Sequence, residues 1–141
     1  MQRLQTRAQF QAVLAGSTVA RTPHFALHRC ALEGPARAGE SAAPALFEPA
    51  ATWLGAMVPK RWAKRAVTRN AIKRQIYNVS ADFEAAMPQA AYVVRLRSGF
   101  DRKVFPSATS DALKAAVRAE LHQLFERLLH SGQGARQGHA P

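Results

Sequence analysis

The chain has 141 residues, which is enough for one domain with a substantial hydrophobic core but short for two. Its 20 lysines and arginines outnumber 9 aspartates and glutamates, and the net charge of +11 favours a polyanionic partner over a neutral one. The chain has no apolar run of the roughly 20 residues that a spanning helix needs, no secretory signal and only one cysteine, Cys30, so we expect a cytoplasmic nucleic-acid-binding protein without a membrane partner.

The N-terminal part of the chain predicts a short helix and then a strand. Residues 6–15 carry apolar side chains at helical spacing, with Thr6 as an N-cap and a glycine after the last turn. A strand is expected at 24–32, where polar and apolar residues alternate. Its two histidines, His24 and His28, would share one strand face without a third ligand nearby, so no metal site is predicted.

The middle of the chain predicts a loop, a buried strand and a long helix. Residues 33–51 are dominated by Ala, Pro, Gly and Glu, which is typical of a long surface loop. The stretch 52–58 is almost wholly apolar and predicts a central strand. The helix that follows, roughly 20 residues long, has a core stripe at helical spacing, formed by Ile72, Ile76, Val79, Phe83 and Met87.

The C-terminal part predicts a strand at 91–97 and a last helix at 107–130. The buried face of that helix is expected to consist of Leu113, Val117, Leu121, Leu124 and Leu128. We therefore predict an α/β fold, a two-layer α+β sandwich in the order helix, three strands, helix, strand, helix. It would form a single domain over 1–130, followed by a disordered tail at 131–141.

The most informative feature is a basic segment without acidic residues. Between Pro49 and Ala81 the chain has seven lysines and arginines and no aspartate or glutamate. On a helical wheel, five polar residues form one face beside the core stripe: Arg69, Asn70, Lys73, Arg74 and Tyr77. A solvated helix face usually mixes both signs of charge for i,i+4 pairs, so this one-sided composition favours a phosphate-binding surface.

At these residues the chain resembles the protein subunit of bacterial ribonuclease P. That family has a strand ending in a lysine pair, a short linker and a helix that opens Arg-Asn-Arg-x-x-Lys-Arg. This chain reads LGAMVPKR at 54–61 and RNAIKR at 69–74, with a similar spacing, and the resemblance extends over 2–130. Two positions depart from the pattern, because Ala71 and Tyr77 stand where the family commonly has arginines.

The resemblance implies a helper protein and an RNA catalyst. In the family, a large RNA uses Mg²⁺ to remove the 5′ leader of precursor tRNA, and the protein supplies no catalytic residue. The implied partners are that RNA and precursor tRNA, without an obligate protein partner. The implied fold is that of ribosomal-protein-like RNA-binding domains, a four-stranded sheet with a left-handed βαβ crossover, against the general preference for right-handed ones.

The resemblance also implies two sets of contacts. Contacts with the catalytic RNA are expected from Lys60, Arg61, Lys64, Arg65, Arg69, Asn70, Lys73, Arg74 and Tyr77. A cleft between the first helix and the sheet would hold the single-stranded leader, with Phe10, Leu14 and Phe25 as its candidates, because exposed aromatic rings stack on unpaired bases. The same three residues are equally compatible with an ordinary core.

Three other functions compete with this interpretation. A ribosomal or ribosome-assembly protein could use the same basic α/β surface to bind RNA. A helix-turn-helix DNA-binding protein is less compatible, because the basic helix is expected to follow a strand. A metal-dependent nuclease acting alone would need a carboxylate cluster, and the carboxylates of this chain are scattered.

Overall fold

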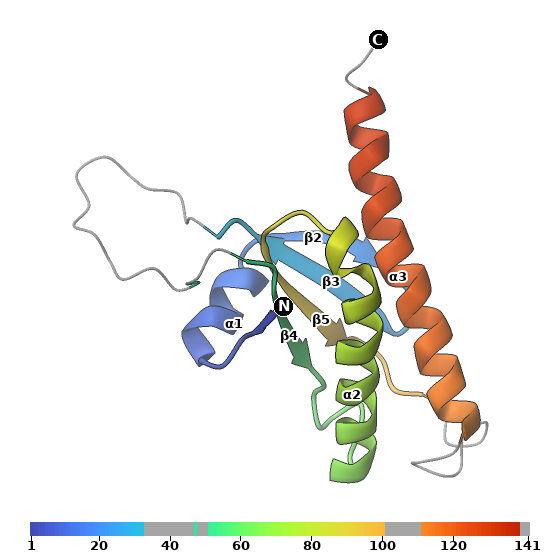
Figure 1. Ribbon diagram of the computed structural model, residues 1–141. Coiled ribbons are helices and arrows are strands. Elements are labelled where there is room, and N and C mark those ends of the chain that lie inside the picture. The colour runs from blue at the N-terminus through green and yellow to red at the C-terminus, as the bar shows by residue number, and fades with distance from the viewer. Residues whose placement is uncertain (33–46, 48–50, 101–110, 139–141) are drawn as a thin grey trace.

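The computed structural model describes residues 1–32, 47, 51–100 and 111–138, which form one mixed sheet with helices on both faces (Figure 1). The elements in chain order are β1 (Gln2–Arg3), α1 (Arg7–Leu14), β2 (Ser17–Arg21), β3 (Phe25–Cys30), β4 (Trp53–Met57), α2 (Ala66–Phe83), the 3₁₀ turn η1 (Glu84–Ala86), β5 (Ala91–Leu96) and α3 (Asp111–Gly138).

The sheet has the strand order β1-β4-β5-β3-β2. Strands β1, β4 and β5 are parallel, whereas β3 runs antiparallel to β5 and to β2. Between Thr18 and Ala20 the register of β2 against β3 shifts, which marks a bulge. Helix α2 connects β4 to its parallel neighbour β5. In Figure 1 both strands point downward, with β5 to the right of β4 and α2 in front, so this crossover is left-handed.

The larger core lies between the sheet and the pair α2 and α3. Alternate residues of β5, such as Tyr92 and Val94, point into this core and are fully buried. Helix α2 contributes Ile72, Ile76, Val79 and, less deeply, Phe83, and Met87 follows after η1. Helix α3 contributes Leu113, Val117, Leu121, Leu124, Phe125 and Leu128. Both predicted helix stripes are therefore confirmed, because a 3.6-residue period leaves one face for burial.

A smaller core lies under α1 on the opposite face of the sheet. Val13 of α1 packs there with Trp53 and Val93, which point away from the larger core. The ring of Phe10 lies close over Gly55, where an added Cβ would be 2.6 Å from Phe10 Cε1. Only a residue without a side chain allows this approach. Helix α1 thus adds a third layer to the predicted two-layer sandwich.

The start of α1 is fixed by a capping box, as Thr6 predicts. Thr6 Oγ1 accepts a hydrogen bond from the Gln9 backbone N–H at 3.2 Å. Gln9 Oε1 accepts from the backbone N–H groups of Thr6 at 3.0 Å and of Gln5 at 2.6 Å. These contacts satisfy N–H groups that a helix start leaves unpaired, and they hold α1 at a defined place beside β1.

The mixed α/β class and the order of helices and strands between α1 and α3 are confirmed, with some corrections. The sheet has five strands and not four, because β1, only two residues long, pairs with β4. Helix α3 continues to Gly138, past the predicted end at residue 130, since a packed helix extends at little cost once nucleated. The predicted loop at 33–51 lies outside the described residues except for Phe47 and Ala51, and so does the predicted helix start at residue 107.

Candidate nucleic-acid interface

The basic segment begins with a folded turn, residues 59–65, between β4 and α2. The carbonyl oxygen of Pro59 accepts hydrogen bonds from the N–H groups of Trp62 at 3.1 Å and Ala63 at 3.2 Å. Ala63 is buried in the larger core, so the turn is anchored by an apolar residue between its charged ones. We call residues 59–65 the basic turn.

Arg69 fastens the basic turn to α2. Its Nη1 donates hydrogen bonds to the carbonyl oxygens of Ala63 at 2.9 Å and Lys64 at 2.8 Å. The guanidinium thus satisfies two carbonyl groups just before the helix. The main chain of the turn is consequently fixed relative to the helix, so both elements present their cations from one support.

All nine residues predicted to contact the catalytic RNA lie on the basic turn and the first part of α2, and we call them together the basic surface. Those exposed to solvent are Lys60, Arg61, Lys64, Arg65, Asn70 and Arg74. Arg69, Lys73 and Tyr77 are half-buried. The structure places the nine on adjoining elements, four on the basic turn and five on α2, where the helical wheel groups them on one face.

Arg3 adds a cation beside the basic surface that the sequence did not predict. It belongs to β1, and its Cζ lies 4.0 Å from the ring centroid of Tyr77, a cation–π contact. This places a cation beside Tyr77, the position where the chain lacks the arginine of the family pattern. No local signal predicts the contact, because it depends on the pairing of β1 with β4 across fifty residues of sequence.

The start of α2 adds to the positive potential. Its N-cap residue, Arg65, makes no side-chain cap hydrogen bond, and the first turn contains no acidic residue. The N–H groups and dipole at a helix start favour anions. The acidic residues of this region lie at the other end, where Glu84 pairs with the Met1 ammonium at 2.8 Å and Asp82 lies 3.7 Å from Arg118. Charge is therefore segregated along α2.

The three candidates for the leader cleft do not come together. Phe10 and Leu14 are half-buried on α1 and pack against the smaller core. Phe25 is 0% exposed and belongs to the larger core, on the opposite face of the sheet. It is a core residue because successive strand residues point to opposite faces, so the cleft retains only Phe10 and Leu14 as candidates.

The sheet face on the α1 side has a polar row centred on His28. Arg95 Nε donates to His28 Nε2 at 3.2 Å, and Thr18 Oγ1 lies 3.1 Å from His28 Nδ1. Since arginine only donates, Nε2 accepts and the ring proton is on Nδ1, where it bonds Thr18. Burial lowers the pKa of His28, and the charges of Arg95 and Arg21 lower it further. The sheet face beside α1 therefore carries two arginines and a neutral histidine.

The two histidines predicted to share a strand face are separated. His24 stacks on Phe100 with centroids 4.0 Å apart, and its Nδ1 is 2.7 Å from Glu120 Oε1 of α3. Glu120 also accepts a hydrogen bond from Thr22 Oγ1 at 2.7 Å. His24 thus helps fasten α3 to the β2–β3 connection. In the described part of the chain, no three His, Cys, Asp or Glu side chains are grouped to hold a metal ion.

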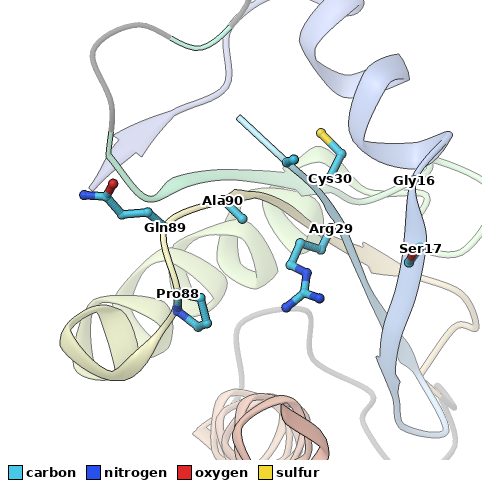
Figure 2. A pocket seen from close by; sticks show the side chains of 8 residues that line it. Gly16, Ser17, Arg29, Cys30, Pro88, Gln89 and Ala90 are labelled. Atoms are coloured by element: carbon cyan, nitrogen blue, oxygen red, sulfur yellow. The ribbon is translucent and has the colours of Figure 1, made fainter. Parts of the chain in front are cut away.

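A hollow of about 470 Å³ lies away from the basic surface, where β2 and β5 begin and β3 ends (Figure 2). It is lined by Gly16, Ser17, Arg29, Cys30, Ala31, Pro88, Gln89 and Ala90. Burial raises the pKa of the Cys30 thiol, which keeps it protonated and unreactive. None of the nine residues of the basic surface lines this hollow. None of the helices in the described ranges is long and apolar enough to span a bilayer.

Comparison with known proteins links this arrangement to one family. The sequence profile of the family described as Ribonuclease P matches residues 1–129. The chain is 36% identical over 126 residues to the ribonuclease P protein component of Bordetella parapertussis, covering 89% of this chain and 90% of that protein. Its identity to the same component of Bordetella avium is 37%, with the same coverage.

A solved structure with a similar fold is the RNase P protein of Staphylococcus aureus. Its TM-score is 0.62 at 20% sequence identity, and the match covers 89% of this chain and 94% of that one. At 20% identity this similarity supports the fold alone. Similarity in sequence is shown by the family profile and by the Bordetella proteins.

Proposed function

The chain belongs to the ribonuclease P family, and on that premise we propose that it binds the catalytic RNA and the leader of precursor tRNA during 5′ maturation. As the protein component of this endoribonuclease it has the RNA subunit as its partner, and the RNA carries the chemistry. A role as a ribosomal or ribosome-assembly protein is not favoured, because the family match spans nearly the whole chain.

The observation that carries the proposal is the basic surface, whose seven cations lie in a segment of more than thirty residues without an acidic one. We assign it to the catalytic RNA, through Lys60, Arg61, Lys64, Arg65, Arg69, Asn70, Lys73, Arg74 and Tyr77. Lysine and arginine neutralise phosphates, and arginine bonds two phosphate oxygens at once. Because Arg69 holds the turn to the helix, the main chain that carries these charges needs little ordering when RNA binds.

Mg²⁺ enters the proposal as a cofactor of the RNA subunit. The residues of the basic surface are cations, an amide and a phenol, which do not suit a magnesium ion that prefers carboxylate and phosphate oxygens. Their role would be to reduce the repulsion between closely spaced phosphates. RNA phosphates folded against this surface would then hold the metal at a lower Mg²⁺ concentration.

We assign the leader of precursor tRNA to the sheet face beside α1. Phe10 and Leu14 offer apolar surface there, and Arg21 and Arg95 contribute positive charge on the same face. A single strand bound without sequence preference needs this combination of stacking groups and cations. The proposal includes a single domain over 1–130 and a cytoplasmic location, which suits the free Cys30.

A leader-cleavage assay tests this function. The protein is added to the RNA of ribonuclease P and a labelled precursor tRNA at low Mg²⁺, and removal of the 5′ leader is followed. We expect strong stimulation, reduced several-fold by Arg61→Ala because the RNA loses a phosphate contact. The matched control is Arg118→Ala, which removes one positive charge from α3, where Arg118 faces Asp82 of α2. This variant should stimulate like the wild type.

Two results would contradict the proposal. A wild-type protein that fails to stimulate cleavage would exclude the role in ribonuclease P. Cleavage by the protein without the RNA would instead revive a nuclease that acts alone.

A further inference from the structure

Two large apolar side chains are exposed in the described ranges, and both belong to the basic segment. Trp62 of the basic turn is 37% exposed, and Val67 in the first turn of α2 is 49% exposed. The chain has one other tryptophan, Trp53, which is buried beneath α1. A scattered exposed residue needs no explanation, but an exposed indole on a turn that also carries Lys60, Arg61, Lys64 and Arg65 is a specific combination.

The main chain at Trp62 is held on several sides. Its N–H donates to the Pro59 carbonyl at 3.1 Å. A Cβ added to Gly99, in the segment after β5, would lie 2.9 Å from the Trp62 carbonyl oxygen, so the two backbones are in close contact. The next two carbonyl groups accept from Arg69. The indole is therefore presented from a rigid support, which lowers the entropic cost of binding.

The neighbours of the indole favour a nucleotide. Arg61 Cζ lies 5.2 Å from the ring centroid, and Lys60 and Lys64 are exposed on the same turn. An aromatic ring beside cations suits an unpaired nucleotide, because the ring stacks on the base while the cation neutralises its phosphate. A protein partner would have to supply many acidic groups to match the same surface.

We propose that Trp62 stacks on an unpaired base of the RNA that the basic surface binds. This inference rests on the proposed function and adds to it a contact with a base, where the lysines and arginines contact phosphates. Val67, which has no aromatic face, does not take part in the contact.

The test compares RNA affinities of Trp62→Ala, Trp62→Phe and Trp62→Leu by fluorescence anisotropy with labelled ribonuclease P RNA. We expect Trp62→Ala to weaken binding about 10-fold, the order of magnitude of one lost stacking contact, and Trp62→Phe to retain most of the affinity. The slope of log K against log salt should stay unchanged in both, because no charge is lost. Val67→Ala is the matched control and should bind like the wild type.

A fully paired RNA duplex gives a second control, because its bases are not free to stack on an indole. Trp62→Ala should bind the duplex as the wild type does. In the wild type, binding of the catalytic RNA should quench tryptophan emission, and Trp62→Phe should abolish most of that change because Trp53 is buried.

The possible outcomes separate the two proposals. Wild-type affinity in Trp62→Ala, with weakened binding by Arg61→Ala, would overturn the stacking contact and leave the proposed function intact. Full affinity in Trp62→Leu would show that apolar packing, and not stacking, explains the residue. A wild-type protein that does not bind the RNA would overturn both proposals.

Discussion

At the scale of single residues, the sheet face beside α1 favours the neutral form of His28. The Nε2 atom of His28 accepts a hydrogen bond from Arg95, whose guanidinium stays protonated and can only donate. A second proton on the ring, at Nε2, would therefore break that contact. Burial, Arg95 and Arg21 all lower the pKa of His28, so the folded protein prefers the neutral ring.

The resulting prediction concerns stability against pH. The folded-state pKa of His28 is below its ordinary value of 6.5, so on acidification the unfolded chain takes up the proton first. The free energy of unfolding should fall as the pH is lowered from about 8 to about 5, and His28→Gln should show a shallower fall. Urea denaturation followed by circular dichroism at several pH values measures this, and equal pH dependence in both proteins would contradict it.

Single residues are also where sequence reasoning is weakest. Phe10 and Phe25 are both phenylalanines in apolar surroundings, and nothing local shows that they lie on opposite faces of the sheet. Their separation depends on which face α1 covers, a long-range property. Arg3 was missed for the same reason, because its contact with Tyr77 requires β1 to pair with β4. Periodicity predicts burial within an element but not which elements meet.

At the scale of elements, the basic turn and α2 form one unit because an α2 side chain holds the turn. We expect Arg69→Ala to lower the free energy of unfolding by about 1–2 kcal/mol, since two hydrogen bonds are lost and two carbonyl groups lose a partner. Arg74→Ala is the matched control. Arg74 is exposed on the same helix, so its loss should change stability by less than about 0.5 kcal/mol.

Thermal and urea unfolding of both variants give these values, and RNA binding gives the complementary comparison. Both should bind RNA more weakly, but only Arg69→Ala should also be destabilised. Equal stability of the two variants would mean that the turn is held by Ala63 and the Pro59 carbonyl without help from Arg69.

Elements with a strong period were predicted well, and edge elements were not. The stripes of α2 and α3 follow from spacing alone, because most of their apolar residues pack on the sheet. The central strands β4 and β5 are apolar enough to recognise. By contrast, β2 is mostly exposed or half-buried at the sheet edge, and β1 has two residues, so neither has a distinct hydrophobic pattern.

At the scale of the whole molecule, the net charge of +11 predicts that added salt stabilises the free protein but weakens its binding to RNA. Without RNA, added salt should raise the free energy of unfolding because it screens self-repulsion. Binding of RNA should weaken, with a slope of log K against log salt of about −5 to −6 if the seven cations of the basic segment each neutralise a phosphate. Denaturation and anisotropy titrations over a range of salt concentrations check both, and a slope near zero would exclude phosphate contacts.

The two outer strands of the sheet have a consequence for the protein before it meets RNA. An open strand edge is a template on which another copy can add a strand and start aggregation. Here one edge strand, β1, is only two residues long, and the other, β2, is interrupted by the bulge between Thr18 and Ala20. Short and bulged edges pair poorly with a new strand. Free copies awaiting their RNA are thereby protected from joining edge to edge.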